Sequence, residues 1–246
     1  MDNQNFNFKE PAQIQNVSAE VMSRTFMAKV FTWMFIGLGI TGLVSYFFAA
    51  TPSLLDAIYI TTDNVIRMTT LGWVVRLSPF VIILIMGLGM NRLSYPVIAA
   101  SFIIFSALLG ISLSSIFVLY TGGSIASIFF VTSAMFGVMA IMGYTTHSDL
   151  TKLGPILMMG LFGIIIASIV NAFIGSTSMY YMLNFLLVAV FTGFIAYDVQ
   201  KIKSIGAQIN EDGSTTGKLA VWAAMSIYLD FVNLFLALLR IFGGRR

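Results

Sequence analysis

The sequence predicts an all-α, polytopic membrane protein that crosses the bilayer seven times. Hydrophobic residues make up 58% of the 246 positions and charged residues only 9%, whereas soluble domains carry about 25% charged residues. Seven stretches are long enough to span, since a transmembrane helix needs roughly 20 mostly apolar residues. We therefore expect a mobile polar tail over 1–23, a transmembrane domain over 24–244 and a basic end at 245–246.

The seven expected spans follow one another with short polar breaks between most of them. Their approximate limits are Met27–Ala50, Val74–Met90, Pro96–Leu119, Ser124–Tyr144, Pro155–Ile174, Met179–Val199 and Leu219–Phe242. Prolines at 79, 96 and 155 fall near predicted helix starts, where a missing N–H does little harm. The longest early loop covers 51–73, and a polar break over 200–218 separates the last two spans. No removable signal peptide is expected, because no cationic segment leads into a short apolar core and a cleavage site.

Composition excludes several classes of function. The chain has no cysteine, which removes disulfides, thiolate nucleophiles and cysteine-ligated metals. Its one histidine, His147, cannot build a histidine-based metal site alone. The net charge is +3, and the 13 Lys and Arg residues are scattered over loops rather than clustered on one face, which argues against nucleic-acid binding. The remaining chemistry is that of oxygen ligands, and we expect no resident cofactor.

The distribution of basic residues predicts that the N-terminus is cytoplasmic. Lys and Arg near span ends are retained inside the cell. With seven spans, the N-terminal side holds eight of them, at 9, 24, 29, 92, 152, 201, 203 and 218, against five at 67, 76, 240, 245 and 246. The basic C-terminal end conflicts with this orientation, because an odd number of spans places it outside.

The last span carries a polar stripe. Asp230 is the only charged residue between Lys218 and Arg240, and a carboxylate at this depth costs a few kcal/mol unless it is neutralised or partnered. The stripe steps by four, three, four and three residues through Ser226, Asp230, Asn233, Ala237 and Arg240, which puts these positions on one helical face. We expect this face to meet protein or water. The alternative is a stripe that only joins helices through hydrogen bonds.

A second carboxylate, Asp198, lies near the end of the sixth span. If this helix continues to about Ile205, Asp198 sits roughly 10 Å from its end at 1.5 Å per residue, and Asp230 lies roughly 18 Å along the returning helix. Both carboxylates are thus expected in the inner half of the membrane or near its midplane, with Arg92 at the inner end of the second span able to reach them. Asp198 could instead be an interfacial residue that pairs with Lys201 or Lys203, and Arg92 an ordinary topogenic anchor.

Two buried carboxylates permit three kinds of chemistry. Like charges in a low-dielectric site resist simultaneous ionisation, so the pair titrates as a unit and can act as a proton-sensitive switch. The pair can also form a transient site for a hard cation such as Ca²⁺, or the acid and base of an aspartyl protease. Tyr197-Asp198 resembles a presenilin-type motif, but Ile227-Tyr228-Leu229 precedes the second carboxylate without either expected glycine. Intramembrane proteolysis is therefore a remote alternative, and we expect no enzyme.

Three segments carry a resemblance to a known family. They read SRTFMAKVFTWM (Ser23–Met34), GFIAYDVQKIK (Gly193–Lys203) and SIYLDFVNLFLALLRIFGG (Ser226–Gly244). These segments resemble the start of helix one and the C-terminal signature of the Bax inhibitor-1 family, also called transmembrane Bax inhibitor motif proteins. The resemblance covers nearly the whole chain and implies a fold in which six helices pack around a central seventh.

The resemblance also implies a function. Bacterial members are described as pH-sensitive calcium leak channels of the inner membrane, whose two aspartates form a proton-sensing dyad latched by an arginine. Asp198 and Asp230 match the dyad, with weak and transient contact to the permeant Ca²⁺. Arg92 matches the latch by position only, because the usual run of basic residues is reduced to Asn91-Arg92-Leu93. Some members resemble modulators of a membrane-anchored AAA protease, a partner to which the tail over 1–23 would be presented.

Overall fold

The computed structural model describes residues 11–62, 65–209 and 213–245, which are almost entirely helical. Its elements are α1 (Pro11–Ala50), α2 (Pro52–Ile58), β1 (Tyr59–Thr62), β2 (Val65–Met68), α3 (Thr70–Gly89), α4 (Tyr95–Leu113), α5 (Ser115–Leu119), α6 (Gly122–Thr145), α7 (Leu153–Ile174), α8 (Thr177–Gln208) and α9 (Gly213–Phe242). Within these residues seven helical segments are long and apolar enough to cross a membrane, with α4 and α5 forming one of them. The seven expected spans are confirmed.

Two helices extend well beyond the apolar stretches that predicted them. Helix α1 begins at Pro11, so 11–23, expected to belong to the tail, are helical, while the expected tail over 1–10 lies outside the described residues. Proline suits the first turn of a helix, and no glycine or further proline interrupts the chain before Gly37. An ion pair between Arg24 and Glu20, 2.6 Å long and one turn apart, supports this polar part. Likewise α8 runs to Gln208, so most of the expected break over 200–218 is helix.

The expected loop over 51–73 is ordered by a short helix and a hairpin. Strands β1 and β2 pair antiparallel, with Tyr59 opposite Met68. The Thr69 hydroxyl accepts a hydrogen bond from the Gly72 N–H at 2.9 Å and donates one to the Ala57 carbonyl at 2.7 Å. Thr69 therefore caps α3 and ties its start to the end of α2.

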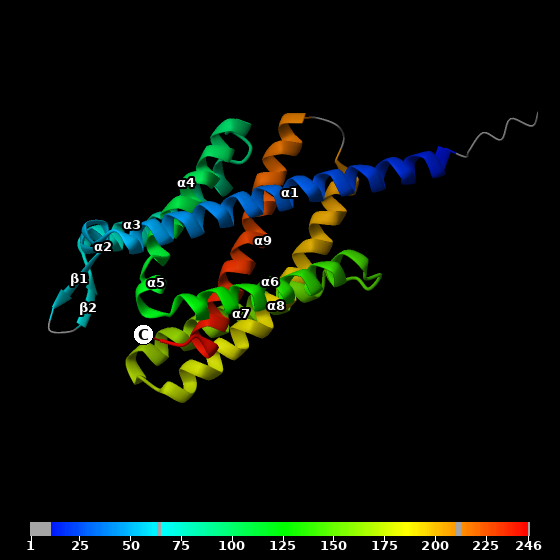
Figure 1. Ribbon diagram of the computed structural model, residues 1–246. Helices are drawn as coiled ribbons and strands as arrows, with labels where there is room; N and C mark the ends of the chain where they lie inside the picture. The colour runs from blue at the N-terminus through cyan, green and yellow to red at the C-terminus, as the bar shows by residue number, and fades with distance from the viewer. Residues whose placement is uncertain (1–10, 63–64, 210–212, 246) are drawn as a thin grey trace, which may run out of the picture.

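Helix α9 lies at the centre of the bundle (Figure 1). It packs against α1, α4, α6 and α8, whereas α3 packs mainly on α4 and α7 on α8. In its most apolar stretch 61% of the residues are buried, against 11 to 44% in the other six spans. Small buried residues at 220, 223 and 224, all alanine, let neighbouring backbones approach closely. The predicted central seventh helix is confirmed, with α1, α4, α6 and α8 making its main contacts.

A buried hydrogen-bond chain fixes α9 against α1 and α4. The Tyr228 ring is fully buried, and its hydroxyl lies 2.6 Å from Thr41 Oγ1, which donates to the Ser106 carbonyl at 2.9 Å. Polar groups in the membrane interior need partners within the protein. This chain satisfies three of them and sets the rotation of α9 about its axis, which determines where its polar stripe faces.

The two ends of the bundle carry different parts of the chain. Close to the start of α1, Ser23 Oγ donates to the Lys203 carbonyl near the end of α8 at 3.0 Å. At the other end, the backbone of Arg245 pairs with Tyr120 in the α5–α6 connection. The start of α1 and the C-terminus therefore lie at opposite ends, as an odd number of spans requires.

Candidate functional site

The two intramembrane carboxylates lie in one cavity of about 510 Å³ between the start of α7, α8 and α9. Asp198 is 8% exposed and Asp230 6% exposed. The cavity wall is mixed, with apolar residues at 155, 158, 161, 191, 194 and 229, and polar side chains from Tyr197, Asp198, Lys201, Ser226, Asp230 and Asn233. The close packing of α8 on α9 along their length brings the two sequence-predicted aspartates together.

The carboxylate pair is incompletely hydrogen-bonded. Ser226, one helical turn before Asp230, donates its hydroxyl to Asp198 Oδ2. Asp198 and Asp230 line the same cavity, and among the described residues Asp230 Oδ2 has no hydrogen-bond partner. Two like charges in one buried site resist simultaneous ionisation, and a proton shared by the two carboxyl groups would supply that partner.

The polar stripe of α9 contributes three of its members to the cavity. Ser226, Asp230 and Asn233 line it, and Asn233 Nδ2 donates to the Leu229 carbonyl at 2.8 Å. Ala237 is buried outside the cavity, and Arg240 is exposed in the last turn of α9. The stripe thus lines the cavity over its first half and is buried in protein at Ala237, and Arg240 lies apart from the site.

Arg92 does not reach the carboxylates in this structure. It is exposed in the turn after α3 and does not line the cavity. Within the described ranges the one salt bridge formed joins Arg24 to Glu20. The turn is instead attached to the start of α9, because Lys218 Nζ donates to the Met90 and Leu93 carbonyls at 3.5 and 3.4 Å.

Lys201 is the cation that the structure places at the site. It lines the cavity, and its Nζ lies 5.8 Å from the centroid of the Tyr197 ring. Its charge acts on Asp198 without a direct ion pair. Sequence reasoning considered Lys201 only as a partner in solvent, although the spacing of three residues already put it on the same face as Asp198. Lys203, the other candidate, instead donates to the Tyr144 carbonyl at 2.8 Å.

The α6–α7 loop is fastened beside the cavity by a residue that sequence reasoning missed. Gln200 donates through Nε2 to the Ser148 carbonyl and accepts through Oε1 from the Leu150 N–H, both at 2.8 Å. In the same loop, hydrogen bonds from the side chain and backbone of Thr151 hold the pKa of Asp149 below its usual range. Asp149 therefore stays ionised under mildly acidic conditions.

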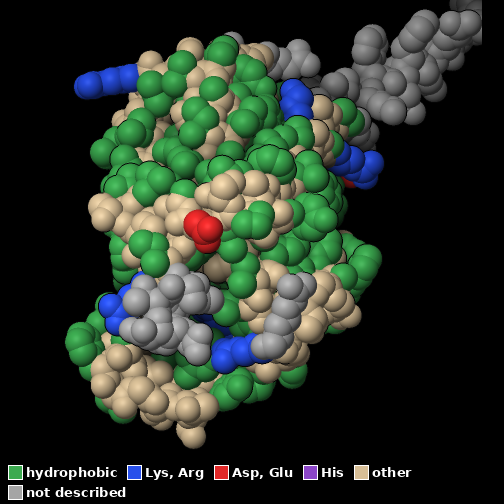
Figure 2. All heavy atoms as spheres, turned by 60° about the vertical axis from the view of Figure 1, so that its left-hand side comes forward, with side chains coloured by type: hydrophobic (Ala, Val, Ile, Leu, Met, Phe, Trp, Pro, Cys, Tyr) green, Lys and Arg blue, Asp and Glu red, His purple; other side chains and the backbone are tan. Residues whose placement is uncertain are grey.

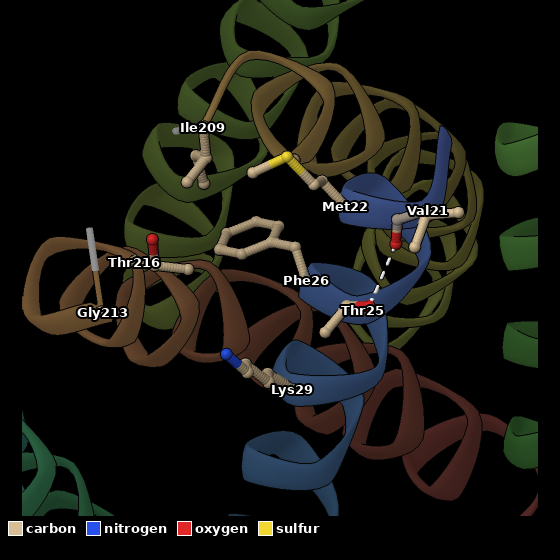
Figure 3. Close-up of a pocket in the computed structure, with 9 residues that line it drawn as sticks. Val21, Met22, Thr25, Phe26, Lys29, Ile209, Gly213 and Thr216 are labelled. Atoms are coloured by element: carbon tan, nitrogen blue, oxygen red, sulfur yellow. Dashed lines mark hydrogen bonds between the residues drawn. The ribbon is translucent and has the colours of Figure 1, made fainter. Parts of the chain in front are cut away.

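A second hollow, of about 320 Å³, lies where α1 meets the end of α8 and the start of α9. Phe26 and Met22 form part of its wall, and the Lys29 side chain extends from α1 toward α9 (Figure 3). Thr25 Oγ1 donates to the Val21 carbonyl at 3.0 Å and is thereby satisfied within α1. None of the described residues that line this hollow is a carboxylate, so it is separate from the carboxylate cavity.

The oxygen atoms at the site make up only part of a Ca²⁺ coordination shell. Ca²⁺ takes six to eight oxygen ligands. No cluster of three or more His, Asp or Glu side chains suited to a metal occurs in the described part of the chain. Asp198 and Asp230, with the Ser226 and Asn233 oxygens, offer a partial shell that water would complete.

Comparison with known proteins gives the family. A family model described as "Inhibitor of apoptosis-promoting Bax1" matches residues 23–246. The chain belongs to the Bax inhibitor-1 family. The resemblance inferred from the first, sixth and seventh spans is thereby confirmed, and the chain is an integral membrane protein.

Bacterial relatives in the Bax inhibitor-1 family align with nearly the full chain. Inner membrane protein YbhL of Escherichia coli (strain K12) is 40% identical over 224 residues, which cover 91% of this chain and 93% of YbhL. A protein of Borreliella burgdorferi is 39% identical over 226 residues, or 92% and 94% of the two chains. One of Caulobacter vibrioides is 36% identical over 237 residues, or 96% and 95%.

Proposed function

We propose that this member of the Bax inhibitor-1 family is a pH-sensitive Ca²⁺ leak channel that opens when the carboxylate pair is protonated. The observation that carries the proposal is the placement of Asp198 and Asp230 in one cavity, both buried and with an oxygen of Asp230 left unpaired. Burying an ionisable pair of this kind in the membrane costs free energy, and such groups mark ion pathways and proton relays. No step of the proposal is enzymatic.

The gate follows from the charge of the pair. An ionised carboxylate attracts a nearby cation, and this attraction holds the helices that carry the two groups together. Lys201 lines the cavity but lies on α8, the helix that carries Asp198, so its attraction to that carboxylate joins no two helices. We propose that Arg92 supplies the joining cation in a latched state, after the turn over 90–94 moves toward the cavity. Protonation removes the negative charge, which weakens this attachment and favours an open path.

A competing effect runs in the opposite direction. Ionised carboxylates attract Ca²⁺ better than protonated ones, so acid also lowers the occupancy of the path. Gating dominates, because conduction requires an open path before affinity matters, and tight binding slows exit. The leak is therefore expected to rise on acidification.

We also propose that the protein resides in the bacterial inner membrane with its N-terminus in the cytoplasm. The relative YbhL is named an inner membrane protein, which supports this location. The greater number of Lys and Arg residues on the N-terminal side supports the orientation. In this orientation the Ser23–Lys203 end of the bundle faces the cytoplasm.

The structure also offers an observation that favours a second candidate, an interaction protein that modulates a membrane-anchored AAA protease. The first turns of α1 extend away from the other helices as a helical arm (Figure 1). An arm of this kind can be presented to a partner, and a channel does not need it.

Ca²⁺ flux into vesicles that contain only this purified protein separates the two candidates. A channel leaks without any partner, and removing residues 1–18 leaves that leak unchanged. A modulator leaves the vesicles as tight as protein-free ones, which would contradict the channel proposal. In that case the loss of partner binding on removal of 1–18 identifies the arm as the functional element.

A further inference from the structure

A lipid-facing groove of about 690 Å³ lies between α1 and α6 on the side of α9 away from the carboxylate pair. Helix α1 packs on α4, α5, α8 and α9, and α6 packs on α8 and α9. The two helices meet through the edge-to-face contact of Phe31 with Phe136, whose ring centroids are 6.3 Å apart. Beyond this contact the seam widens, with Phe231 and Phe235 of α9 at the back of the groove.

The groove is open toward the lipid phase. Gly39 and Gly42 of α1 line it, and no atom lies within 4 Å of the place where a side chain of either would begin. Leu43 and Phe130, on the two sides, are 73% and 72% exposed. Because these helices span the membrane, the surroundings of such a groove are acyl chains.

One polar atom in the groove has no partner. The side chain of Ser45 lines the groove and is only 3% exposed, and its hydroxyl makes no hydrogen bond within the described residues. Thr41, one turn earlier, is fully satisfied by Tyr228 and the Ser106 carbonyl. An unpaired hydroxyl in an apolar environment is costly. Ser45 therefore indicates an occupant that brings a hydrogen-bond acceptor to this level.

The depth of Ser45 identifies the kind of acceptor. Ser45 precedes the end of α1 at Ala50 by five residues, or about 8 Å at 1.5 Å per residue. From Phe35 to Ser45 the groove follows α1 for ten residues, about 15 Å, which is half of the roughly 30 Å hydrocarbon core. The groove is thus as long as one leaflet, with its hydroxyl near the boundary between acyl chains and headgroups, where the ester carbonyls of phospholipids lie.

A cation stands at the same end of the groove. Arg245 pairs with Tyr120, two residues before Gly122 of the groove wall, and Gly244 N–H donates to Ser124 Oγ at 3.0 Å. Interaction with the Tyr120 hydroxyl raises the pKa of Arg245, so its positive charge is secure. Seen with the hairpin end turned forward, hydrophobic side chains are spread over the surface, with one acidic side chain near its middle and Lys and Arg side chains at its edges and in its lower part (Figure 2). This charge is complementary to a lipid phosphate.

We propose that the groove binds one acyl chain of a membrane phospholipid, with Ser45 donating a hydrogen bond to the ester carbonyl and Arg245 facing the phosphate. The length of the groove, the unpaired hydroxyl and the cation next to the α5–α6 connection match the acyl chain, the ester carbonyl and the phosphate of such a lipid. The site is independent of the carboxylate pair, from which α9 separates it.

Photocrosslinking in nanodiscs tests this proposal. The full chain is placed in an equimolar mixture of phosphatidylethanolamine and phosphatidylglycerol that contains a trace of phosphatidylglycerol with a diazirine in one acyl chain. Labelling is expected to concentrate on 35–45 and 122–130. Gly42→Leu fills the groove and should abolish this labelling, whereas Gly163→Leu, an equal addition at an open position of α7, should leave it unchanged.

Ser45→Ala provides a second variant that keeps the shape of the groove. It should lower the crosslink yield about fivefold, the factor that corresponds to one ordinary hydrogen bond. Even labelling over all lipid-facing helices, or labelling that survives both Gly42→Leu and Ser45→Ala, overturns the proposal. Preferential labelling by a free fatty acid with the same diazirine chain overturns the assignment to a phospholipid. Thermal unfolding of each variant verifies that it is folded.

Discussion

At the scale of single residues, the unpaired oxygen of Asp230 distinguishes a functional pair from a structural one. If the two carboxyls only joined α8 to α9, replacing one of them would weaken the bundle. Asp230→Asn removes a buried ionisable group at nearly constant volume, and with it the cost of burying one carboxyl group beside another. We expect its unfolding temperature in detergent to equal or exceed that of the parent. A clear loss of stability would support the purely structural alternative.

Arg92 provides the second residue-scale prediction. Pairing with an ionised carboxylate would close the path, and breaking a partly buried pair costs several kcal/mol when one partner is left uncompensated. Arg92→Ala should therefore raise the Ca²⁺ leak at neutral or mildly alkaline pH and flatten the rise on acidification. Arg76→Ala, at the other end of α3, is the matched control and should behave like the parent.

One result for Arg92→Ala would assign a different role to this residue. If the Ca²⁺ leak of the variant is as low as that of the parent at alkaline pH, Arg92 is only a topogenic anchor. Lys201 would then be the cation to replace, because it already lines the cavity.

The carboxylate pair could be predicted from the sequence because its two residues belong to neighbouring segments of the chain. Asp198 and Asp230 lie on consecutive helices joined by a short connection, so their proximity followed from the antiparallel packing expected of such neighbours. The position of Arg92 depends on how α3 packs, and α3 lies on α4 at the periphery. No periodicity of the sequence carries that information. The same holds for Gln200, whose partners lie about 50 residues away in the chain.

At the scale of elements, the contact of α6 with α8 depends on a glycine. A side chain at Gly143 would overlap the backbone of Ala196 on α8, whereas one at Gly137 of the same helix would meet open space. Gly143→Ala should lower the free energy of unfolding by about 1–3 kcal/mol, the usual cost of overpacking. Gly137→Ala should be neutral or slightly stabilising. Equal unfolding temperatures for the two variants would contradict the close approach of α6 and α8.

The hydropathy pattern predicted the membrane-embedded parts of the helices and missed their polar extensions. Helix α1 starts at Pro11 and α8 continues to Gln208, because helix propensity does not end where apolar residues end. The hairpin of β1 and β2 also escaped prediction, since two strands of four residues leave little periodicity to detect.

At the scale of the whole molecule, the proposed lipid site gives the basic C-terminal end a role. The pairing of Arg245 with Tyr120 places this end opposite the start of α1. The C-terminal arginines therefore stand against the charge rule if the N-terminus is cytoplasmic. In the proposed lipid site Arg245 binds a phosphate instead, which gives it a role on the outer side.

Cysteine accessibility tests this orientation, and the absence of native cysteine makes the assay clean. Asn3→Cys should be shielded from an impermeant thiol reagent in intact cells, because we place the N-terminus in the cytoplasm. Ser178→Cys, in the first turn of α8 at the opposite end, should react. Reaction at position 3 with protection at position 178 would reverse the orientation.

The central claim is that protonation of Asp198 and Asp230 opens a path for Ca²⁺, and a pH series of Ca²⁺ flux tests it most directly. The parent protein and its Asp198→Asn and Asp230→Asn variants are reconstituted separately in otherwise protein-free vesicles. The account predicts a leak that rises as the parent is acidified and loses its pH dependence in each variant, rather than being scaled by a constant factor. Single Asn variants that keep the parental pH profile would contradict it.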